Sequence, residues 1–385
     1  MRWTGFVLSS SNGLEKRPKL RFPGFDEPWE RKTLSGLSKI VKGEQLPSTD
    51  VNPEGLFYHL NGGVSPSSRT DKFNVDANTI SISEGGNSCG YVNWNPEPFF
   101  SGGHNYTLQK IVEEVSPYFL YEALKSKQTE IMALRVGSGL PNIQKKDIEK
   151  FPLYIPSKKE QNHIADFLRL VDSKVEEQSL LINNLKKYKR GLLSNLFGEK
   201  ITQGCTTKSY YFSEIAQRRS EKYDPSSGIE YPCVELENIE QETGKILATV
   251  PSTAQSSIKN IAMPGDTLFG KLRPYLRKYA FAKKTMACSS EIWALIPSDV
   301  VLPKFLFYLV QTEHFLRVAN ISSGTKMPRA EWSNIEKAEF FIPDFSVQRK
   351  VVSLLEGLDQ KITFADSTLL SLNRLKASLL QHLFI

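Results

Sequence analysis

The segment whose residue spacing comes nearest to a catalytic motif is "PGDTLFGKLRPYLRKYAF", residues 264–281. Two glycines and Lys271 follow the spacing of a phosphate-binding loop, in which a Ser or Thr after the lysine holds Mg²⁺. Leu272 occupies that position and has no oxygen to offer a metal. Pro274 lacks a backbone N–H and disfavours a helix at this point. The segment therefore predicts a basic hairpin rather than a nucleotide site.

The same hairpin combines basic and aromatic side chains, which suits a phosphate backbone. Cationic side chains displace counterions from DNA, while planar groups stack or reach base edges. A solvated, charged hairpin is the other interpretation, and the segment by itself does not decide between the two. The candidate DNA contacts in it are Lys271, Arg273, Tyr275, Arg277 and Lys278.

Basic residues elsewhere extend the hypothesis of DNA binding to both halves of the chain. The net charge of +7 and the isoelectric point of about 9.0 favour a polyanionic partner. In the second half the further candidates are Arg218, Arg219, Lys222, Lys326 and Arg329. In the first half they are Lys42, Arg69, Lys72, His104, Arg135, Lys145 and Lys146.

Motifs for bond making are weak throughout the sequence. The segment "NPEP" (95–98) lacks the second proline and the aromatic residue of an amino-methyltransferase loop, and no G-x-G-x-x-G follows a strand. Asp344 with Asp359 and Lys361 has the residue types of a Mg²⁺-dependent nuclease, but Asp344 is better explained as a helix N-cap. The five histidines show no paired metal-ligand spacing. We predict no catalytic residues and no metal site.

Composition restricts the class of protein. A chain of 385 residues with 40% hydrophobic and 24% charged residues is typical of two or three globular domains. It contains no apolar run long enough for a membrane span and no secretory signal pattern, and its four cysteines form no C-x-x-C pair. These features predict a cytoplasmic protein without a membrane partner.

An internal duplication is the most specific feature of the sequence. "GSGLPNIQKKDIEKFPLYIP" (137–156) aligns with "GTKMPRAEWSNIEKAEFFIP" (324–343), so that Pro141 matches Pro328. The same offset in residue number continues without a gap to Leu196, which matches Leu383. Upstream of the aligned segments the two copies diverge. Each half is therefore predicted to be a variable globular part followed by a more similar tail.

Both tails have the heptad pattern of a coiled coil. The apolar steps alternate between four and three residues, which predicts a helix seam with a partner helix. Two such helices in one chain are each other's obvious partners, and about 40 residues at ~1.5 Å per residue make a rod of roughly 60 Å. The predicted seam residues are Ile164, Leu168, Val171, Val175, Ile182, Leu185, Leu192 and Leu196, with Val351, Leu355, Leu358, Ile362, Leu369, Leu372, Leu379 and Leu383 in the second copy.

One polar residue recurs at the same seam position in both copies, as Lys189 and Lys376. A lysine at a seam either extends its ammonium group to solvent or specifies the helix register. We favour the first interpretation. For the helix starts, Ser157 and Glu160 predict a capping box in the first copy, and Asp344 predicts the N-cap in the second.

The predicted fold is α+β, with two mixed α/β globular domains separated by two long antiparallel coiled-coil helices in a pseudo-two-fold repeat. Short strands are expected near 79–82, 91–94, 265–268 and 292–295, and helices near 117–127 and 303–318. The domain boundaries that we expect are 1–19 for an unstructured or non-native leader, 20–156 and 199–343 for the globular domains, and 157–198 and 344–385 for the helices.

The order of these segments resembles the specificity subunit of type I restriction–modification systems. "PKLRFPGFDEPWE" (18–30) resembles the usual start of the family, and "GDTLFGKLRPYLRK" and "CSSEIWALIP" resemble its second target-recognition domain. "IPSKKEQNHIADFLRLVDSKV" and "IPDFSVQRKVVSLLEGLDQKI" resemble its two conserved helical regions. The leader before Leu20 departs from the family pattern.

The resemblance implies a non-catalytic subunit that binds double-stranded DNA. Each recognition domain would recognise one half of a bipartite, asymmetric target, and the helix pair would set the spacing between the halves. The helix pair would also dock two methyltransferase subunits, which use S-adenosylmethionine to methylate adenine N6. Restriction subunits using ATP and Mg²⁺ would join the complex, and this chain itself would hold no cofactor. The alternatives are a coiled-coil adaptor that binds proteins and, less favoured, a stand-alone nuclease.

Overall fold

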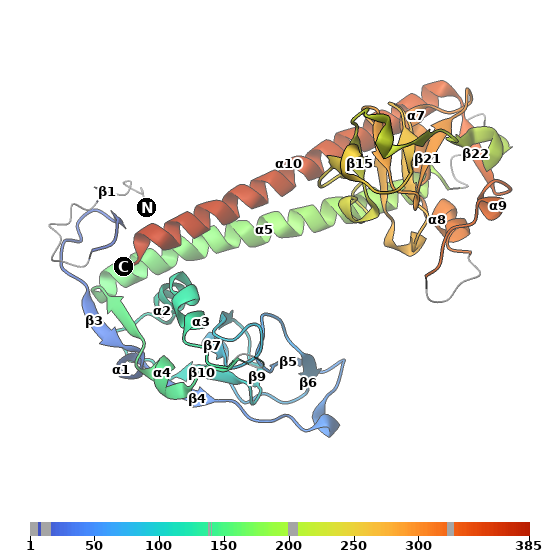
Figure 1. The fold of residues 1–385 in the computed structure, drawn as a ribbon. Coiled ribbons are helices and arrows are strands. Elements are labelled where there is room, and N and C mark those ends of the chain that lie inside the picture. The colour runs from blue at the N-terminus through green and yellow to red at the C-terminus, as the bar shows by residue number, and fades with distance from the viewer. Residues whose placement is uncertain (1–6, 9–16, 138, 140, 199–206, 322–326) are drawn as a thin grey trace. The chain divides into compact units, whose positions relative to one another are not determined.

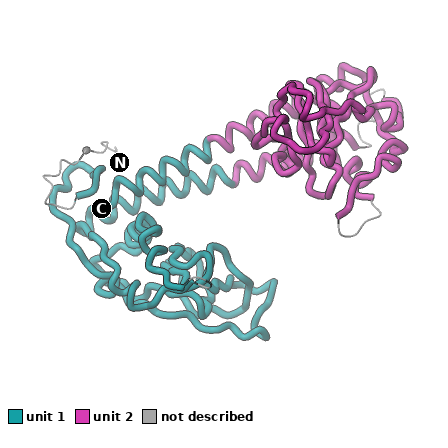
Figure 2. The backbone as a smooth tube through the Cα atoms, in the orientation of Figure 1, with its two compact units in different colours: residues 1–179, 368–385 teal, residues 180–367 magenta. Residues whose placement is uncertain are grey.

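The computed structural model describes residues 7–8, 17–137, 139, 141–198, 207–321 and 327–385. These residues form two compact units, which Figure 2 shows in different colours. Unit 1 comprises residues 1–179 and 368–385, and unit 2 comprises residues 180–367. Each unit therefore contains one globular part together with a portion of two long helices, α5 (Lys158–Leu196) and α10 (Phe345–Leu383).

The globular part of unit 1 is built on a four-stranded antiparallel sheet in the order β4-β10-β7-β8. A three-stranded sheet, β6-β5-β9, and a junction pair, β3-β11, accompany it (Figure 1). The strands are β1 (Val7–Leu8), β2 (Leu20–Arg21), β3 (Glu30–Thr33), β4 (Lys39–Lys42), β5 (Phe57–Leu60), β6 (Ser68–Thr70), β7 (Thr79–Ser83), β8 (Val92–Asn95), β9 (Phe100–Ser101), β10 (Asn105–Gln109) and β11 (Pro152–Ile155). The helices are α1 (Leu34–Leu37), α2 (Pro117–Ser126), α3 (Gln128–Ala133) and α4 (Lys145–Glu149), with a 3₁₀ turn at Ser48–Asp50.

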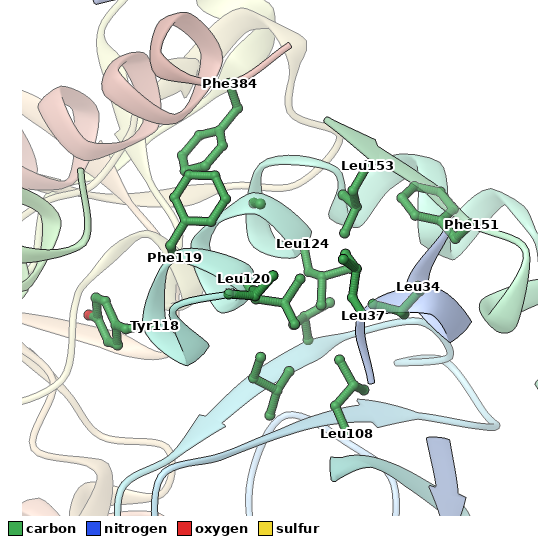
Figure 3. Close-up of a cluster of buried hydrophobic side chains, with 14 of the residues drawn as sticks. Leu34, Leu37, Leu108, Tyr118, Phe119, Leu120, Leu124, Phe151, Leu153 and Phe384 are labelled. Atoms are coloured by element: carbon green, nitrogen blue, oxygen red, sulfur yellow. The ribbon is translucent and has the colours of Figure 1, made fainter. Parts of the chain in front are cut away.

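The core of unit 1 joins the sheet to both long helices. Alternating apolar residues of the central strands meet the buried face of α2, which includes Phe119 and Leu120 (Figure 3). Phe384, directly after the end of α10, packs against Phe119 with their ring centroids 5.5 Å apart. Burial of such side chains contributes ~1.5–3 kcal/mol each. The residues at the end of α10 are therefore part of the core of the first globular part.

The globular part of unit 2 repeats this plan, with a five-stranded sheet where unit 1 has the three-stranded one. Its four-stranded sheet has the order β13-β21-β18-β19, and a five-stranded mixed sheet has the order β14-β17-β20-β15-β16. The strands are β12 (Thr207–Tyr211), β13 (Ala216–Arg218), β14 (Lys222–Tyr223), β15 (Pro232–Val234), β16 (Val250–Pro251), β17 (Lys259–Ala262), β18 (Thr267–Gly270), β19 (Tyr279–Phe281), β20 (Met286–Cys288), β21 (Ile292–Pro297) and β22 (Glu339–Pro343). The helices are α6 (Phe212–Ile215), α7 (Pro303–Leu309), α8 (Glu313–Ala319) and α9 (Trp332–Ile335), with 3₁₀ turns η3 (Pro225–Ser227), η4 (Leu236–Asn238), η5 (Ser252–Ala254) and η6 (Pro274–Leu276).

The two long helices pack together as antiparallel partners within each unit, which confirms the predicted fold class. In unit 1 the first part of α5 lies with the last part of α10, and in unit 2 the last part of α5 lies with the first part of α10. All sixteen predicted apolar seam residues are buried or half-buried, and those with the least exposure are Ile164, Leu168, Val171, Ile182, Val351, Leu355, Leu358, Ile362, Leu379 and Leu383.

A buried glutamine attaches each globular part to the start of its long helix. The amide of Gln161 accepts from the backbone N–H of Ser116 (2.8 Å) and donates to the carbonyls of Glu114 and Pro156. Gln348, its counterpart in the second copy, makes the same three bonds to Leu302, Val300 and Pro343. Each amide satisfies one backbone N–H and two backbone carbonyls next to the start of its helix, so the repeated glutamine has a structural role.

The repeated seam lysines form ion pairs, and the preferred interpretation that they extend to solvent is wrong. In unit 2, the ammonium of Lys189 lies 2.7 Å from Asp359 on the facing helix, and its side chain is only 8% exposed. In unit 1, Lys376 lies 2.6 Å from Asp172 and 3.1 Å from Glu122. A buried charge needs a partner at one position along the facing helix, so these pairs specify the helix register.

Three local predictions differ from the structure. Val7–Leu8, within the expected leader, forms β1 because β2 offers it an unpaired edge; residues 1–6 and 9–16 lie outside the described residues. The side chain of Glu160 bonds the guanidinium of Arg21 instead of closing a capping box. The helix expected at 303–318 is two helices, because the side chain of Thr312 accepts from the backbone N–H of Phe315 and begins a new helix. Asp344 caps α10 as predicted.

The boundaries of the globular parts follow the junction strands, which are the pair β3-β11 in the first part and the pair β12-β22 in the second. The first part runs from β2 to the end of β11, and the second from β12 to the end of β22. Residues 199–206, at the start of the expected second domain, lie outside the described residues. Among the helices that the structure describes, none has a stretch that is both long and apolar enough to cross a membrane.

Candidate nucleic-acid interface

Among the described residues, the surface whose side chains best suit binding to DNA is a basic groove in unit 2. The groove has a volume of about 670 Å³ and lies over β13 and β21, next to α9. Its described lining contains four basic side chains and two tryptophans but no carboxylate. The residues that give it this character are Arg218, Arg219, Lys222, Lys271, Trp293 and Trp332. Cations beside aromatic faces are the chemistry expected for contact with a polyanion that carries flat bases.

Arg218 is held in the groove by the two tryptophans. Its guanidinium lies 4.7 Å from the ring centroid of Trp332 and 5.7 Å from that of Trp293. The two indole rings meet edge to face, with centroids 5.6 Å apart. This contact orients the cation without neutralising it, because the aromatic faces carry no net charge. The groove therefore presents an oriented positive charge.

Arg219, the neighbour of Arg218, has a structural role instead. Its guanidinium makes two bonds to the carboxylate of Asp266, at 2.6 and 2.9 Å, and the two side chains are only 13% and 3% exposed. The hydrogen bond to Asp266 raises the pKa of Arg219. A bidentate pair of this kind holds β13 to the turn before β18, and it leaves little of Arg219 for a ligand.

Other predicted cations of unit 2 differ in their availability. Arg329 forms a two-bonded pair with Glu291, and Lys278 donates to the carbonyl of Leu236. Arg277 pairs with Glu313 at 2.7 Å. Arg273 and Tyr275 are exposed on the turn between β18 and β19. Lys326 lies outside the described residues.

In unit 1, three of the predicted residues gather around the end of β7. The buried carboxylate of Glu84 accepts from Lys42 (2.6 Å) and from the phenol of Tyr106 (2.8 Å). His104 approaches its other oxygen at 3.7 Å. Burial and the Glu84 carboxylate raise the pKa of the Tyr106 phenol. Burial also raises the pKa of the thiol of Cys89, which follows β7, and the charge of Arg135 opposes that shift, so this cation belongs to the same region.

The remaining predicted residues of unit 1 are dispersed. Arg69 donates to the carbonyls of Gly55 and Leu56, and Lys72 pairs with Asp50, both on the three-stranded sheet side. Lys145 lies 3.6 Å from Glu149 on α4, and Lys146 is exposed on the same helix. The structure therefore does not join Arg69, Lys72 and Lys146 to Lys42 and His104 in one site. Only the backbone of Lys145 reaches the phenol of Tyr106, beside Glu84.

The residues considered for nuclease chemistry have structural partners. Asp344 accepts two backbone N–H groups at the start of α10, while Asp359 pairs with Lys189 and accepts from the phenol of Tyr308. About fifteen helical residues separate the two aspartates, which places them roughly 22 Å apart at ~1.5 Å per residue. The described residues contain no cluster of three or more potential metal ligands.

Sequence reasoning missed Trp293, Trp332 and Glu84 as parts of candidate sites. The tryptophans lie in separate segments of the sequence, and only the packing of α9 on β21 brings them together. The sequence offers one signal that could have pointed to Glu84. The offset between the two copies aligns it with Lys271, which belongs to the basic hairpin.

The fold and the groove define a class of protein. Its members have a duplicated α+β domain, and each copy shares a core with one end of a helix pair. The second copy has a surface suited to binding a polyanion. Comparison with known proteins agrees. Residues 26–187 and 212–374 both match a family described as the Type I restriction modification DNA specificity domain. The chain belongs to this family.

Individual relatives support the assignment over different lengths. A Mycoplasma genitalium protein described as a putative type I specificity subunit is 39% identical over 171 residues, which make up 44% of this chain and 44% of that protein. The chain thus spans less than half of that relative. The MjaVIII specificity subunit of Methanocaldococcus jannaschii is 22% identical over 89% of this chain and 88% of its own. The crystal structure of a type I S subunit from M. genitalium has a TM-score of 0.65 and 27% identity, covering 96% of this chain and 99% of that chain.

Proposed function

We propose that this chain is the DNA sequence-recognition subunit of a type I restriction–modification complex. Each globular part would recognise one half of a bipartite target through the major groove of DNA. The observation that carries the proposal is the presence of two copies of one specificity domain in a single chain. Because the two copies carry different side chains at their candidate DNA surfaces, the half-sites that they recognise should differ.

The long helices would set the spacing between the half-sites. Each helix has 39 residues and continues from one unit into the other, and the seam ion pairs oppose sliding of one helix along its partner. A helix has a fixed rise of ~1.5 Å per residue, so a locked pair converts chain length into a constant separation. That separation would correspond to a constant number of base pairs between the halves.

The helix pair would also dock two methyltransferase subunits. Its surface exposes large apolar side chains that a lone helix pair has no reason to keep, including Leu170, Leu180, Leu181, Tyr188, Leu354, Phe364, Leu370 and Leu375. Apolar residues exposed along helices are suited to helical partners. The methyltransferase subunits would supply S-adenosylmethionine and methylate adenine N6. Restriction subunits with ATP and Mg²⁺ would join through them, and this chain would contribute no catalytic residue.

The test is to map adenine methylation in a host that expresses this chain with its cognate methyltransferase. We expect N6-methyladenine at a bipartite sequence whose two halves differ and whose gap is constant. The control is the same methyltransferase without this chain, which should leave that sequence unmethylated. Methylation that does not depend on this chain, or a gap of variable length, would contradict the proposal.

A protein-binding adaptor is the alternative from another class. DNA recognition should weaken steeply as salt rises, because bound cations release counterions from the phosphates. An adaptor would show no such dependence, since its partners are proteins. Measuring the affinity of the complex for duplex DNA at several salt concentrations separates the two functions.

A further inference from the structure

Two loops of equal length occupy the same place in the two globular parts. The loop at 84–91 connects β7 to β8 in unit 1, and the loop at 271–278 connects β18 to β19 in unit 2. Both strand pairs are antiparallel and lie at the same positions in their four-stranded sheets. The loop sequences, "EGGNSCGY" and "KLRPYLRK", share no residue at any position.

Backbone hydrogen bonds show that the loops are equivalent at the offset of the duplication. Gly86 donates to the carbonyl of Pro141 at 3.0 Å, and Arg273 donates to the carbonyl of Pro328 at 2.7 Å. Isolated β-bridges join the same segments. In unit 1 Gly85 pairs with Asn142, and in unit 2 Leu272 pairs with Arg329.

The first position of each loop accepts an equivalent bond. The carbonyl of Glu84 accepts from Ile143 at 2.9 Å, and the carbonyl of Lys271 accepts from Ala330 at 2.8 Å. The first part of the two loops therefore shares one backbone framework. Near the end the loops differ, because Gly90 donates to the carbonyl of Ser83 whereas Arg277 donates to the carbonyl of Pro274.

Two positions of this framework require left-handed backbone, and unit 2 fills both with arginine. In unit 1 these positions are Gly86 and Gly90, with φ of 75° and 86°. In unit 2 they are Arg273 and Arg277, with φ of 50° and 51°. Glycine adopts this conformation freely, whereas a residue with a Cβ is strained in it. Strained residues persist where a function retains the side chain.

The partners of the two arginines separate their roles. Arg277 is held by Glu313 at 2.7 Å and approaches Glu242 at 3.5 Å, so it anchors the end of the loop. Arg273 is exposed, and among the described residues no ion pair or hydrogen bond of its guanidinium occurs. Arg273 is the N-cap of the turn η6, which the next three loop residues form.

We propose that Arg273 is a specificity-determining residue that recognises a base edge in the half-site bound by unit 2. Its chemical target is the paired acceptors of a base in the major groove, which the planar guanidinium contacts through two hydrogen bonds. Gly86, the corresponding position in unit 1, has no side chain to make such a contact. This inference rests on the proposed function, and it assigns a base contact to one residue of one unit.

The test is Arg273→Gly in the full chain, assembled with its methyltransferase and assayed on a duplex library with randomised half-sites. Glycine is the residue found at the equivalent position, so the melting temperature should stay the same or rise. Discrimination should fall about tenfold or more at one base pair of one half-site, and the other half-site should not change. Arg273→Lys should restore it only in part, because an ammonium lacks the rigid, planar pair of donors of a guanidinium.

Matched variants make the result interpretable. Lys337→Gln removes one exposed positive charge from the same unit and should leave the recognised sequence unchanged. Arg273→Asn, which tolerates left-handed backbone, repeats the test if the glycine variant fails to fold. Equal specificity in the Arg273 variants, or an affinity loss that is uniform across all sequences, would overturn the inference. Failure of the unmodified chain to direct any bipartite methylation would instead contradict the proposed function.

Discussion

At the scale of single residues, Glu122 is the most unusual charge in unit 1. Its side chain is fully buried on α2, beside the seam pair of Lys376 and Asp172. Burial raises the pKa of Glu122 to about 7, since Lys376 offsets the desolvation only in part and Asp172 adds repulsion. The equivalent pair in unit 2, Lys189 with Asp359, has the phenol of Tyr308 beside it in place of a second carboxylate.

The expected consequence is a pH-dependent stability that Glu122→Gln removes. The folded state binds this proton more tightly than the unfolded state does, because the pKa is about 7 against an ordinary 4.5. The wild type should therefore lose stability relative to the variant as pH rises from about 4.5 to about 7, on the order of 2–3 kcal/mol in all. Denaturant unfolding at pH 5 and pH 8 measures this difference. Glu176→Gln, an exposed change on α5, is the control, and equal pH profiles for Glu122→Gln and wild type would contradict the assignment.

Individual site residues were the least predictable level of the structure. Arg273 and Arg277 are indistinguishable in the sequence, since both lie in one basic, aromatic segment. The acid that anchors Arg277 is Glu313, which tertiary folding brings to it from 36 residues away. Arg219 is likewise a predicted DNA contact in the sequence, but in the structure it is committed to Asp266. Acidic partners that are distant in the sequence determine which basic side chains remain available for a ligand. A single sequence does not reveal those partners.

At the scale of elements, the seam ion pairs determine how the long helices align. Replacing Lys189 by Met should lower the free energy of unfolding by about 1–3 kcal/mol, because the carboxylate of Asp359 loses its charged partner. The double change Lys189→Met with Asp359→Leu should recover part of that loss, since a matched apolar pair carries no desolvation penalty. Lys187→Met on the same helix is the exposed control.

Denaturant unfolding of the single and double variants gives the coupling energy between Lys189 and Asp359. Strictly additive losses would mean that the two residues do not interact, and would remove the pair as a determinant of register.

Elements with strong local patterns were predictable, while their ends and caps were not. The heptad steps predicted both long helices and the residues buried between them, because a 3.5-residue period places apolar side chains on one stripe that faces a partner helix. Strands β7 and β21 followed from short β-branched and aromatic runs. The capping box at Glu160 failed because Arg21, 139 residues away, offers that carboxylate a stronger partner.

At the scale of the whole molecule, duplication makes each globular part an exchangeable module. The second globular part is bordered by its junction strands, β12 and β22. Residues 207–343 can therefore be replaced by the corresponding segment of another family member. The expected outcome is a new sequence in one half-site, with the other half-site and the gap unchanged, read out as the adenine methylation pattern. A change in both half-sites would show that the modules are not independent. Leu193, Val351 and Leu355 share the core of this module, so the replacement should match their contacts.

The duplication itself was predictable because the segments that anchor the modules kept their residues. Pro141 and Pro328 support equivalent loops, and Gln161 and Gln348 make the same three bonds. The loops at 84–91 and 271–278, which the two prolines support, share no residue. The two sequences therefore differ at a place where the backbone is similar. Equivalent backbone with unrelated side chains leaves no trace in composition or periodicity.

The packing of Leu379, Leu383 and Phe384 into the core of the first globular part affects how the protein is made. A ribosome synthesises that part early, yet the side chains that close its core emerge only after the whole second globular part has been translated. Until then the apolar face at Ile164 and Leu168 lacks the side chains that cover it in the folded chain. A chain that ends before Leu379 should therefore be cleaved by protease within its first globular part faster than the full chain is.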